Sequence, residues 1–435
     1  MVQSVERWEK TEKPPALFDL TTLQREANRT LGYTAQQTLD YLQALYDKKL
    51  STYPRTDSRY LTDDMEAGVP ALVEAAASIC GVTAPETVLA GQVCDSARVS
   101  DHHAVVPTAS AGKADLEALP IGEREILRLV SLGLRRAVCP PCRSAETCST
   151  AVCGGDPYTV KWRSVLSPGW KVYAQTADAE AGSGPDGLTE GQTLPVAAAQ
   201  VKSGKTTPPK HHTEDSLLSA MEMAGKEDMP EDAERQGIGT PATRAAILEK
   251  LVSAGFVERK RAKKTVSLLP TPLGTALITV LPEQLQSPTL TAEWEHRLKE
   301  VERGTLAPGD FMDEIAAMLR ELVETCRPVE GSAVLFPSTR EAVGRCPRCG
   351  GTVTEGRQGF FCENRACGFA IWKNSKWWEN KKKTPTKAIV AALLKDGRTQ
   401  ISGLWSEKTG KTYTATVALT DDGTRASFRL EFSHE

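Results

Sequence analysis

Four cysteines near the C-terminus restrict the fold of this chain more than any other feature. They form two closely spaced pairs with turn-forming residues in each, at Cys346, Cys349, Cys362 and Cys367. This spacing is typical of a zinc ribbon, in which four thiolates bind one tetrahedral Zn²⁺. Since four sulfur ligands leave no open coordination position, the predicted metal is structural. The alternative is a set of four incidental cysteines.

A second group of cysteines is less regular. Its members are Cys139, Cys142, Cys148 and Cys153. Two prolines lie between Cys139 and Cys142, and the spacings of the other two cysteines do not match a known metal-binding pattern. The sequence therefore leaves metal binding by this group open.

Composition indicates a soluble chain with several domains, because 40% of its 435 residues are apolar and 25% are charged. It has no run of 18 apolar residues and no signal peptide, so we predict a cytoplasmic protein without a membrane partner. The formal net charge of −3 means that nucleic-acid binding would need local basic patches. Residues 259–264 and 381–383 are two such patches.

A tyrosine and an arginine stand close together just after a predicted helix. The helix, from Thr34 to about residue 50, begins with the capping-box spacing of Thr34 and Gln37. Pro54 biases Tyr53 away from helical angles and places it on a rigid turn. The forked donors of Arg55 suit a phosphate. The pair is therefore a candidate site for attack on a phosphodiester, or else a buried tyrosine beside a solvated arginine.

Two further segments carry candidate binding groups. His102 and His103 lie in a polar turn before an apolar run, where an imidazole could bond a phosphate or move a proton. Residues 237–244 combine two glycines, a capping threonine and a proline at the start of a helix, a pattern that favours an anion at the helix N-terminus. Arg244 would then clamp the anion. The helix and the basic hairpin predicted after it resemble a winged helix.

Four segments resemble, in the same order, the motifs of type IA DNA topoisomerases: Tyr-Pro-Arg-Thr-Asp-Ser at 53–58, Ser-Asp-His-His at 100–103, Gly-Ile-Gly-Thr-Pro-Ala-Thr-Arg at 237–244 and Leu-Thr-Ala-Glu-Trp-Glu at 290–295. The resemblance covers nearly the whole chain. The double histidine and the C-terminal region look most like topoisomerase III of bacterial mobile elements.

The resemblance implies ATP-independent cleavage of one DNA strand through a 5′-phosphotyrosine, strand passage and religation. It assigns catalysis to Tyr53, Arg55 and His102. It assigns DNA contacts to Thr56, Asp57, Ser58, His103, Gly239, Thr240, Thr243 and Arg244. The expected partner is single-stranded DNA, and the expected location is the bacterial cytoplasm in association with a chromosome or plasmid.

The fold class expected from this resemblance is multidomain α/β and α+β, with a type IA core that forms a partial toroid. The predicted domains are a central β/helical segment at 1–50, a catalytic-tyrosine domain at 51–175, a β linker or arch at 176–210, a helical, winged-helix-like DNA-binding domain at 211–327, a zinc ribbon at 340–372 and a basic α+β domain at 373–435. A β-like stretch is predicted at 193–201.

The family also has an N-terminal Toprim domain with an acidic Mg²⁺ site. This chain contains no Asp-x-Asp pair, and residues 1–33 resemble an interior segment of the family. We therefore expect a C-terminal fragment that lacks the Mg²⁺ site and is inactive alone, with a separately encoded Toprim domain as a candidate partner. The alternative is a non-catalytic DNA-binding zinc-ribbon protein.

Tryptophans follow the cysteine pairs and alternate with lysines, at Trp372, Trp377 and Trp378. Indole rings can stack on unpaired bases while lysines neutralise the nucleic-acid backbone. Packing inside a small domain would explain the same residues, so both interpretations stay open.

Overall fold

The computed structural model describes residues 1–173, 187–224, 237–263, 265–287, 289–325, 341–364 and 366–431. The chain divides into two compact units, Met1–Val329 and Glu330–Glu435. Residues 174–186, which include the start of the predicted arch, lie outside the described residues. Within the described parts, no helix is both long and apolar enough to cross a membrane.

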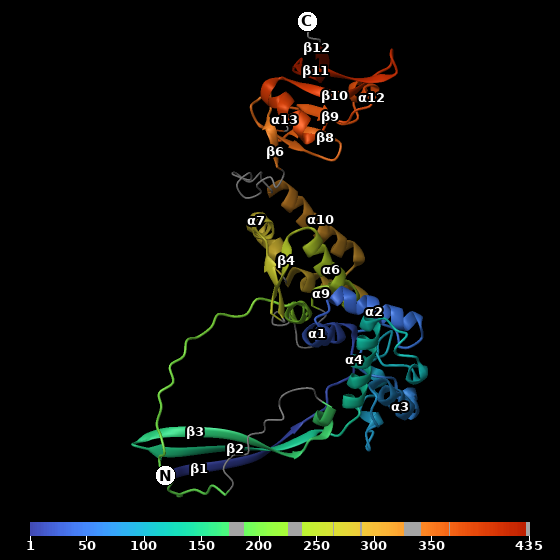
Figure 1. Ribbon diagram of the computed structural model, residues 1–435. Coiled ribbons are helices and arrows are strands. Elements are labelled where there is room, and N and C mark those ends of the chain that lie inside the picture. The colour runs from blue at the N-terminus through green and yellow to red at the C-terminus, as the bar shows by residue number, and fades with distance from the viewer. Residues whose placement is uncertain are drawn as a thin grey trace. The chain divides into compact units, whose positions relative to one another are not determined.

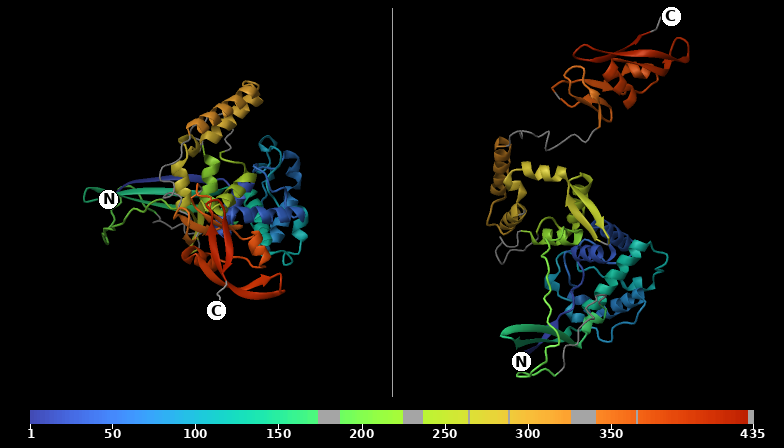
Figure 2. Two further views of the ribbon diagram at one scale, coloured as in Figure 1. Left: turned by 90° about the horizontal axis from the view of Figure 1, so that it is seen from above. Right: turned by 60° about the vertical axis from the view of Figure 1, so that its left-hand side comes forward.

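An antiparallel ribbon begins the first unit. Its strands are β1 (Val2–Glu12), β2 (Cys142–Cys153) and β3 (Asp156–Ser167), in the order β1-β2-β3. Glu12 lies opposite Cys142, so the ribbon joins segments that are far apart in the sequence. Figures 1 and 2 show the ribbon projecting from a body of helices.

The body contains α1 (Leu20–Leu31), α2 (Ala35–Asp47), α3 (Val69–Cys80) and α4 (Ile121–Ala137). The predicted capping box of Thr34 and Gln37 starts α2, and each residue's side chain accepts from the other's backbone N–H. A 3₁₀ turn at Asp63–Gly68 leads directly into α3.

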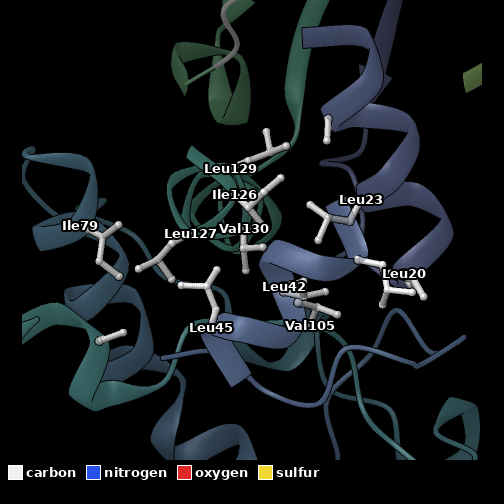
Figure 3. Close-up of a cluster of buried hydrophobic side chains, with 13 residues drawn as sticks. Leu20, Leu23, Leu42, Leu45, Ile79, Val105, Ile126, Leu127, Leu129 and Val130 are labelled. Atoms are coloured by element: carbon white, nitrogen blue, oxygen red, sulfur yellow. The ribbon is translucent and has the colours of Figure 1, made fainter. Parts of the chain in front are cut away.

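Apolar faces of these helices share one core (Figure 3). Leu42 and Leu45 of α2 meet Ile126 and Val130 of α4, and all four side chains are fully buried. Val105, from the strand-like run after the double histidine, joins the same cluster. The core therefore holds both the helix before Tyr53 and the segment after His103 in place.

The chain returns from the ribbon to the helical body along an exposed segment, which ends at α5 (Glu214–Met223) (Figure 1). The prediction of a β-like stretch at 193–201 is wrong, because these residues form no strand. They are exposed, and among the described residues no backbone hydrogen bond pairs them with a strand.

The rest of the first unit carries the predicted helix and hairpin. α6 (Pro241–Ser253) is followed by β4 (Val257–Ala262) and β5 (Thr265–Pro270), which pair antiparallel. The helices after the hairpin are α7 (Pro272–Val280), α8 (Glu283–Gln286), α9 (Thr289–Glu302) and α10 (Pro308–Thr325).

The second unit contains two sheets. The first has β6 (Ala342–Arg345), β7 (Thr352–Glu355), β8 (Gly359–Cys362) and β9 (Ala370–Trp372) in chain order. The short helices α12 (Lys376–Asn380) and α13 (Lys387–Asp396) follow, then a second sheet of β10 (Arg398–Ser406), β11 (Lys411–Asp421) and β12 (Ala426–Glu431). Phe360 and Ile371 of the first sheet share a core with Val390 of α13, so the predicted ribbon and α+β module form one unit.

Candidate active site

The tyrosine loop is attached to the strand-like run after the double histidine. After α2 the chain reverses through Lys49, whose φ of 60° lies in the left-handed region. The Thr52 backbone N–H then donates to Val106 O at 3.0 Å, and the Thr52 hydroxyl donates to Ala104 O at 3.1 Å. Two motifs about 50 residues apart are thereby held side by side.

Tyr53 lies between two other rings. Its ring centroid is 5.5 Å from that of Tyr46 in an edge-to-face contact, and 4.2 Å from the centroid of His102. Edge-to-face and tilted contacts of this kind restrict the orientation of a ring. The half-buried phenol of Tyr53 is therefore held against His102, the histidine that the sequence selected. Tyr46 was not selected, although it lies on the apolar face of the predicted helix.

The next residues of the loop connect it to the histidine motif. The buried hydroxyl of Thr56 donates to His102 O at 2.7 Å, and the buried hydroxyl of Ser58 donates to Arg98 O at 2.9 Å. Asp57 is exposed and accepts from the Ser100 hydroxyl at 2.9 Å. These three residues, predicted to contact DNA, thus make internal hydrogen bonds that hold the two loops together.

A cavity of about 360 Å³ opens beside this loop. Exposed Arg55 and His102 line it, and so do Thr240 and Pro241 at the N-terminus of α6. The free N–H groups and the dipole of a helix N-terminus favour an anion. The structure therefore brings three of the predicted motifs to one cavity.

Arg244 also lines the cavity, but its guanidinium is buried. It donates to Ile238 O at 3.1 Å, to Gly239 O at 3.0 Å and to the Thr21 hydroxyl at 3.0 Å. Burial lowers the pKa of this guanidinium from its usual value. Arg244 thus ties the glycine turn to α1.

The glycine turn depends on close backbone contact. Gly237 has a φ of 67°, and a Cβ there would lie 2.1 Å from Met221 O. Gly239 has a φ of 66°. The Thr243 side chain accepts from the Thr240 backbone N–H at 2.9 Å, which completes the capping box of α6. Only glycine fits position 237 without displacing α5.

His103 makes a local hydrogen bond and does not line the cavity. Its Nδ1–H donates to Ala104 O at 2.9 Å, so Nε2 is the ring nitrogen that takes no part in this bond. His103 is half-buried and does not line the cavity, unlike His102.

Three acidic residues at the cavity were not assigned a role from the sequence: Asp101 of the histidine motif, Asp19 and Glu222. Asp19 caps α1 by accepting from the Thr22 backbone N–H at 2.6 Å and from the Thr22 hydroxyl at 2.8 Å. Its spacing from Thr22 is a capping signal that the sequence does contain. Glu222, at the end of α5, has no such local signal.

Asp19→Asn is expected to stabilise the first unit at neutral pH. Burial raises the pKa of Asp19, so ionisation of this carboxyl costs stability as the pH rises through the folded-state pKa. An asparagine keeps the accepting oxygen for Thr22 and removes the charge. The variant should gain on the order of 1 kcal/mol at pH 7 and nothing near pH 3.5. Thermal unfolding of both proteins across this range, with exposed Asp40→Asn as control, measures the difference; a gain that is independent of pH would contradict this origin.

The four predicted zinc ligands lie together in the second unit. The ligand atoms of Cys346, Cys349, Cys362 and Cys367 all lie within 4.8 Å of one another. The Sγ atoms of Cys346 and Cys367 are 3.5 Å apart, as are those of Cys349 and Cys362. Tetrahedral Zn–S bonds of about 2.3 Å would separate sulfur atoms by about 3.8 Å, so the set fits Zn²⁺. Without a metal the four thiols differ: a hydrogen bond from the Gly351 backbone lowers the pKa of Cys349 to about 7, whereas burial raises the pKa of Cys362 to about 12.

The second cysteine group does not come together as a metal site. Within the residues that the structure describes, the zinc-ribbon set is the only group of three or more potential ligands close enough to bind a metal. The Cys139 thiol donates to Arg135 O at 3.0 Å, inside the body of the unit. Cys142, Cys148 and Cys153 are spread along β2.

The basic hairpin is partly neutralised. Arg259 donates to Glu214 at 2.8 Å and to Glu249 at 2.5 Å, so this side chain holds the hairpin to α5 and α6. Lys260 and Arg261 are exposed on the same strand.

Comparison with known proteins agrees with this arrangement. The model of the DNA topoisomerase family matches residues 1–313. DNA topoisomerase 3 of Bacillus subtilis is 34% identical over 85% of the chain and 53% of its own length, and that of Shouchella clausii is 33% identical over 88% and 55%. The chain spans about half the length of the curated relatives it matches.

The fold has a solved counterpart in full-length topoisomerase I from Thermotoga maritima. The TM-score is 0.56 at 24% identity, over 85% of this chain and 59% of that one. The tyrosine, histidine and glycine-turn motifs meet at one cavity, and the sequence matches cover most of the chain. The chain therefore belongs to the DNA topoisomerase family, as a type IA member that resembles topoisomerase III.

Proposed function

We propose that this chain carries the strand-cleaving part of a type IA topoisomerase. The Tyr53 phenolic oxygen attacks a phosphodiester of single-stranded DNA, and a bond forms between this oxygen and phosphorus. The bond from phosphorus to the 3′-oxygen breaks, the phenolic proton is given up, and the leaving 3′-oxygen takes a proton. After another strand has passed, the 3′-hydroxyl attacks the 5′-phosphotyrosine and releases Tyr53.

One observation carries this proposal: the Tyr53 ring lies 4.2 Å from the His102 ring, beside a cavity that Arg55 and the α6 N-terminus line. A phosphate there would meet the guanidinium of Arg55, which stabilises the negative charge that develops at phosphorus. His102 would donate a hydrogen bond to a phosphate oxygen or accept the phenolic proton.

The other predicted contact residues divide into two roles. Buried Thr56 and Ser58 are positioning residues, since their hydroxyls hold the tyrosine loop to the histidine motif. Thr240, Thr243, Gly239 and Arg244 shape the turn that presents backbone N–H groups to the cavity. Asp57 lines the cavity, whereas His103 does not and would meet DNA only at the edge of the site.

The metals have separate places in this proposal. The four cysteines would hold Zn²⁺, which supplies structure to the second unit and no chemistry. Apart from the four cysteines, the described residues include no group of three or more His, Cys, Asp or Glu side chains close enough together to bind an ion, and no step is assigned to Mg²⁺ here. We propose that a Toprim domain supplies the Mg²⁺ site, and that the chain cleaves DNA in the presence of that domain, in the bacterial cytoplasm.

Arg55→Ala should slow cleavage by about 10²–10³-fold, because one preorganised donor to the developing charge is lost. The assay mixes the variant with a matching Toprim domain, Mg²⁺ and a single-stranded oligonucleotide, and measures the rate of adduct formation. Arg55→Lys should recover part of the loss, since it restores charge without the forked donors. Arg29→Ala, an exposed arginine of α1, serves as control. Equal rates for Arg55→Ala and Arg29→Ala would remove Arg55 from the mechanism.

A further inference from the structure

The short segment that leads into α1 is bonded to the chain just after the tyrosine motif and just after the double histidine. Leu17 O accepts from Arg59 Nε at 3.1 Å. Phe18 O accepts from the Val105 backbone N–H at 2.8 Å. Both acceptors are backbone carbonyls, so these two bonds depend on the path of the segment and not on its side chains.

The first turn of α1 adds contacts to the tyrosine loop and to the glycine turn. The Leu20 backbone N–H donates to Thr56 O at 3.1 Å, and Thr56 is the buried residue whose hydroxyl donates to His102 O. The Thr21 hydroxyl accepts from Arg244 Nη1 at 3.0 Å. The start of one helix is therefore bonded to both sides of the candidate site.

Of these four bonds, the one at Thr21 uses a side chain of the segment. Thr21 and Arg244 are both buried, so water competes little for their bond. The same guanidinium donates to Ile238 O and Gly239 O, in the turn before α6. A hydrogen bond from a charged donor is stronger than a neutral one, and more so in a buried place. The position of Arg244 relative to α1 therefore fixes the position of the glycine turn.

We infer that Thr21 is a positioning residue for strand cleavage, because its hydroxyl holds the glycine turn and the α6 N-terminus at a fixed distance from the tyrosine loop. Thr21 does not line the cavity, so it acts through Arg244, which does. A phosphate in the cavity would meet Arg55 on one side and the α6 N-terminus on the other. The inference rests on the proposed function for the reaction that is positioned, whereas the link between α1 and the glycine turn is independent of it.

Thr21→Val tests this role, because it keeps the branched shape and removes the accepting oxygen. The assay combines the full chain with a matching Toprim domain, Mg²⁺ and a single-stranded oligonucleotide. At saturating DNA, the rate of adduct formation should fall by about 10–100-fold, since small displacements of reacting groups have effects of this size. The DNA concentration that gives half the maximal rate should change by less than about twofold, because the groups that meet the phosphate are retained. Thr21→Ser, which keeps the hydroxyl, should restore most of the rate.

Two further variants separate this contact from a general loss of stability. Thr38→Val removes another buried hydroxyl, which donates to Thr34 O at 3.0 Å at the start of α2, and it should leave the rate unchanged. In an Arg244→Met background, Thr21→Val should cost less than about threefold, because the donor to its hydroxyl is already absent. Equal rate losses in Thr38→Val and Thr21→Val, or full additivity of Thr21→Val and Arg244→Met, would overturn the inference.

Hydrogen exchange tests the link between α1 and the glycine turn without the reaction. In Thr21→Val, amides of residues 237–244 should exchange about tenfold faster, since a hydrogen bond to a charged donor contributes enough to change an opening equilibrium by that factor. Amides of α3, whose residues take no part in the bonds above, should exchange as in the wild type. A normal adduct rate in Thr21→Val would refute the positioning role alone. A wild-type chain that forms no adducts would refute the cleavage function, and unchanged exchange at residues 237–244 would then refute the link as well.

Discussion

Tyr53→Phe is expected to abolish covalent attachment of the protein to DNA. The variant keeps the ring that contacts Tyr46 and His102 but lacks the oxygen that would attack phosphorus. Because removal of a nucleophile typically costs a factor on the order of 10⁶ in rate, adducts should fall below detection. The measurement combines the chain with a Toprim domain, Mg²⁺ and labelled single-stranded DNA, and separates adducts on a denaturing gel.

Two comparisons make this result specific. Tyr158→Phe changes an exposed tyrosine of β3, far along the ribbon, and should form adducts at the normal rate. The wild-type chain without the Toprim domain should form none. Adducts in Tyr53→Phe would mean that another residue is the nucleophile. No adducts in any complemented reaction would favour the non-catalytic DNA-binding alternative.

Removal of the metal is expected to unfold the first sheet of the second unit. The four sulfur atoms join the β6–β7 connection to the β8–β9 connection, and Cys346, Cys362 and Cys367 also contact the apolar core. Structural Zn²⁺ binding at such sites contributes about 10–16 kcal/mol at neutral pH. A strong chelator, or Cys346→Ser, should therefore remove zinc and expose amides of residues 342–372 to rapid hydrogen exchange.

The control for this experiment is Cys153→Ser, an exposed cysteine outside the cluster. It should keep one zinc per chain and normal hydrogen exchange. The first unit should keep its protection in every case, since its core contains none of the four ligands. A purified, reconstituted protein without zinc, or a second unit that stays protected after chelation, would refute the structural metal site.

Several features could be predicted from sequence because they depend on neighbours a few residues apart. The capping boxes of α2 and α6 form between residues three positions apart, at Thr34 with Gln37 and Thr240 with Thr243. The short spacing within each cysteine pair likewise predicts that its two sulfur atoms can bind the same metal ion. Tyr53 and His102 could be selected from their motifs, but the sequence did not predict the contact between their rings.

Predictions failed or were absent where distant residues decide the outcome. Residues 193–201 have a strand-like sequence but form no strand, because a strand needs a partner and no described strand pairs with them. Arg259 belongs to a basic run, yet two glutamates from other helices bind it. Glu222 reaches the cavity only because α5 ends there.

The sequence by itself determined the local elements of this protein: the helix before Tyr53, the glycine turn with its helix, and the four metal ligands. Only the tertiary structure decided that Tyr53, His102 and the α6 N-terminus meet at one cavity, and which tryptophan is core and which is exposed. The physical reason is that helix caps and cysteine pairs depend on interactions between residues only a few positions apart. The site depends instead on a core of α1, α2 and α4 and on hydrogen bonds between segments about 50 to 220 residues apart.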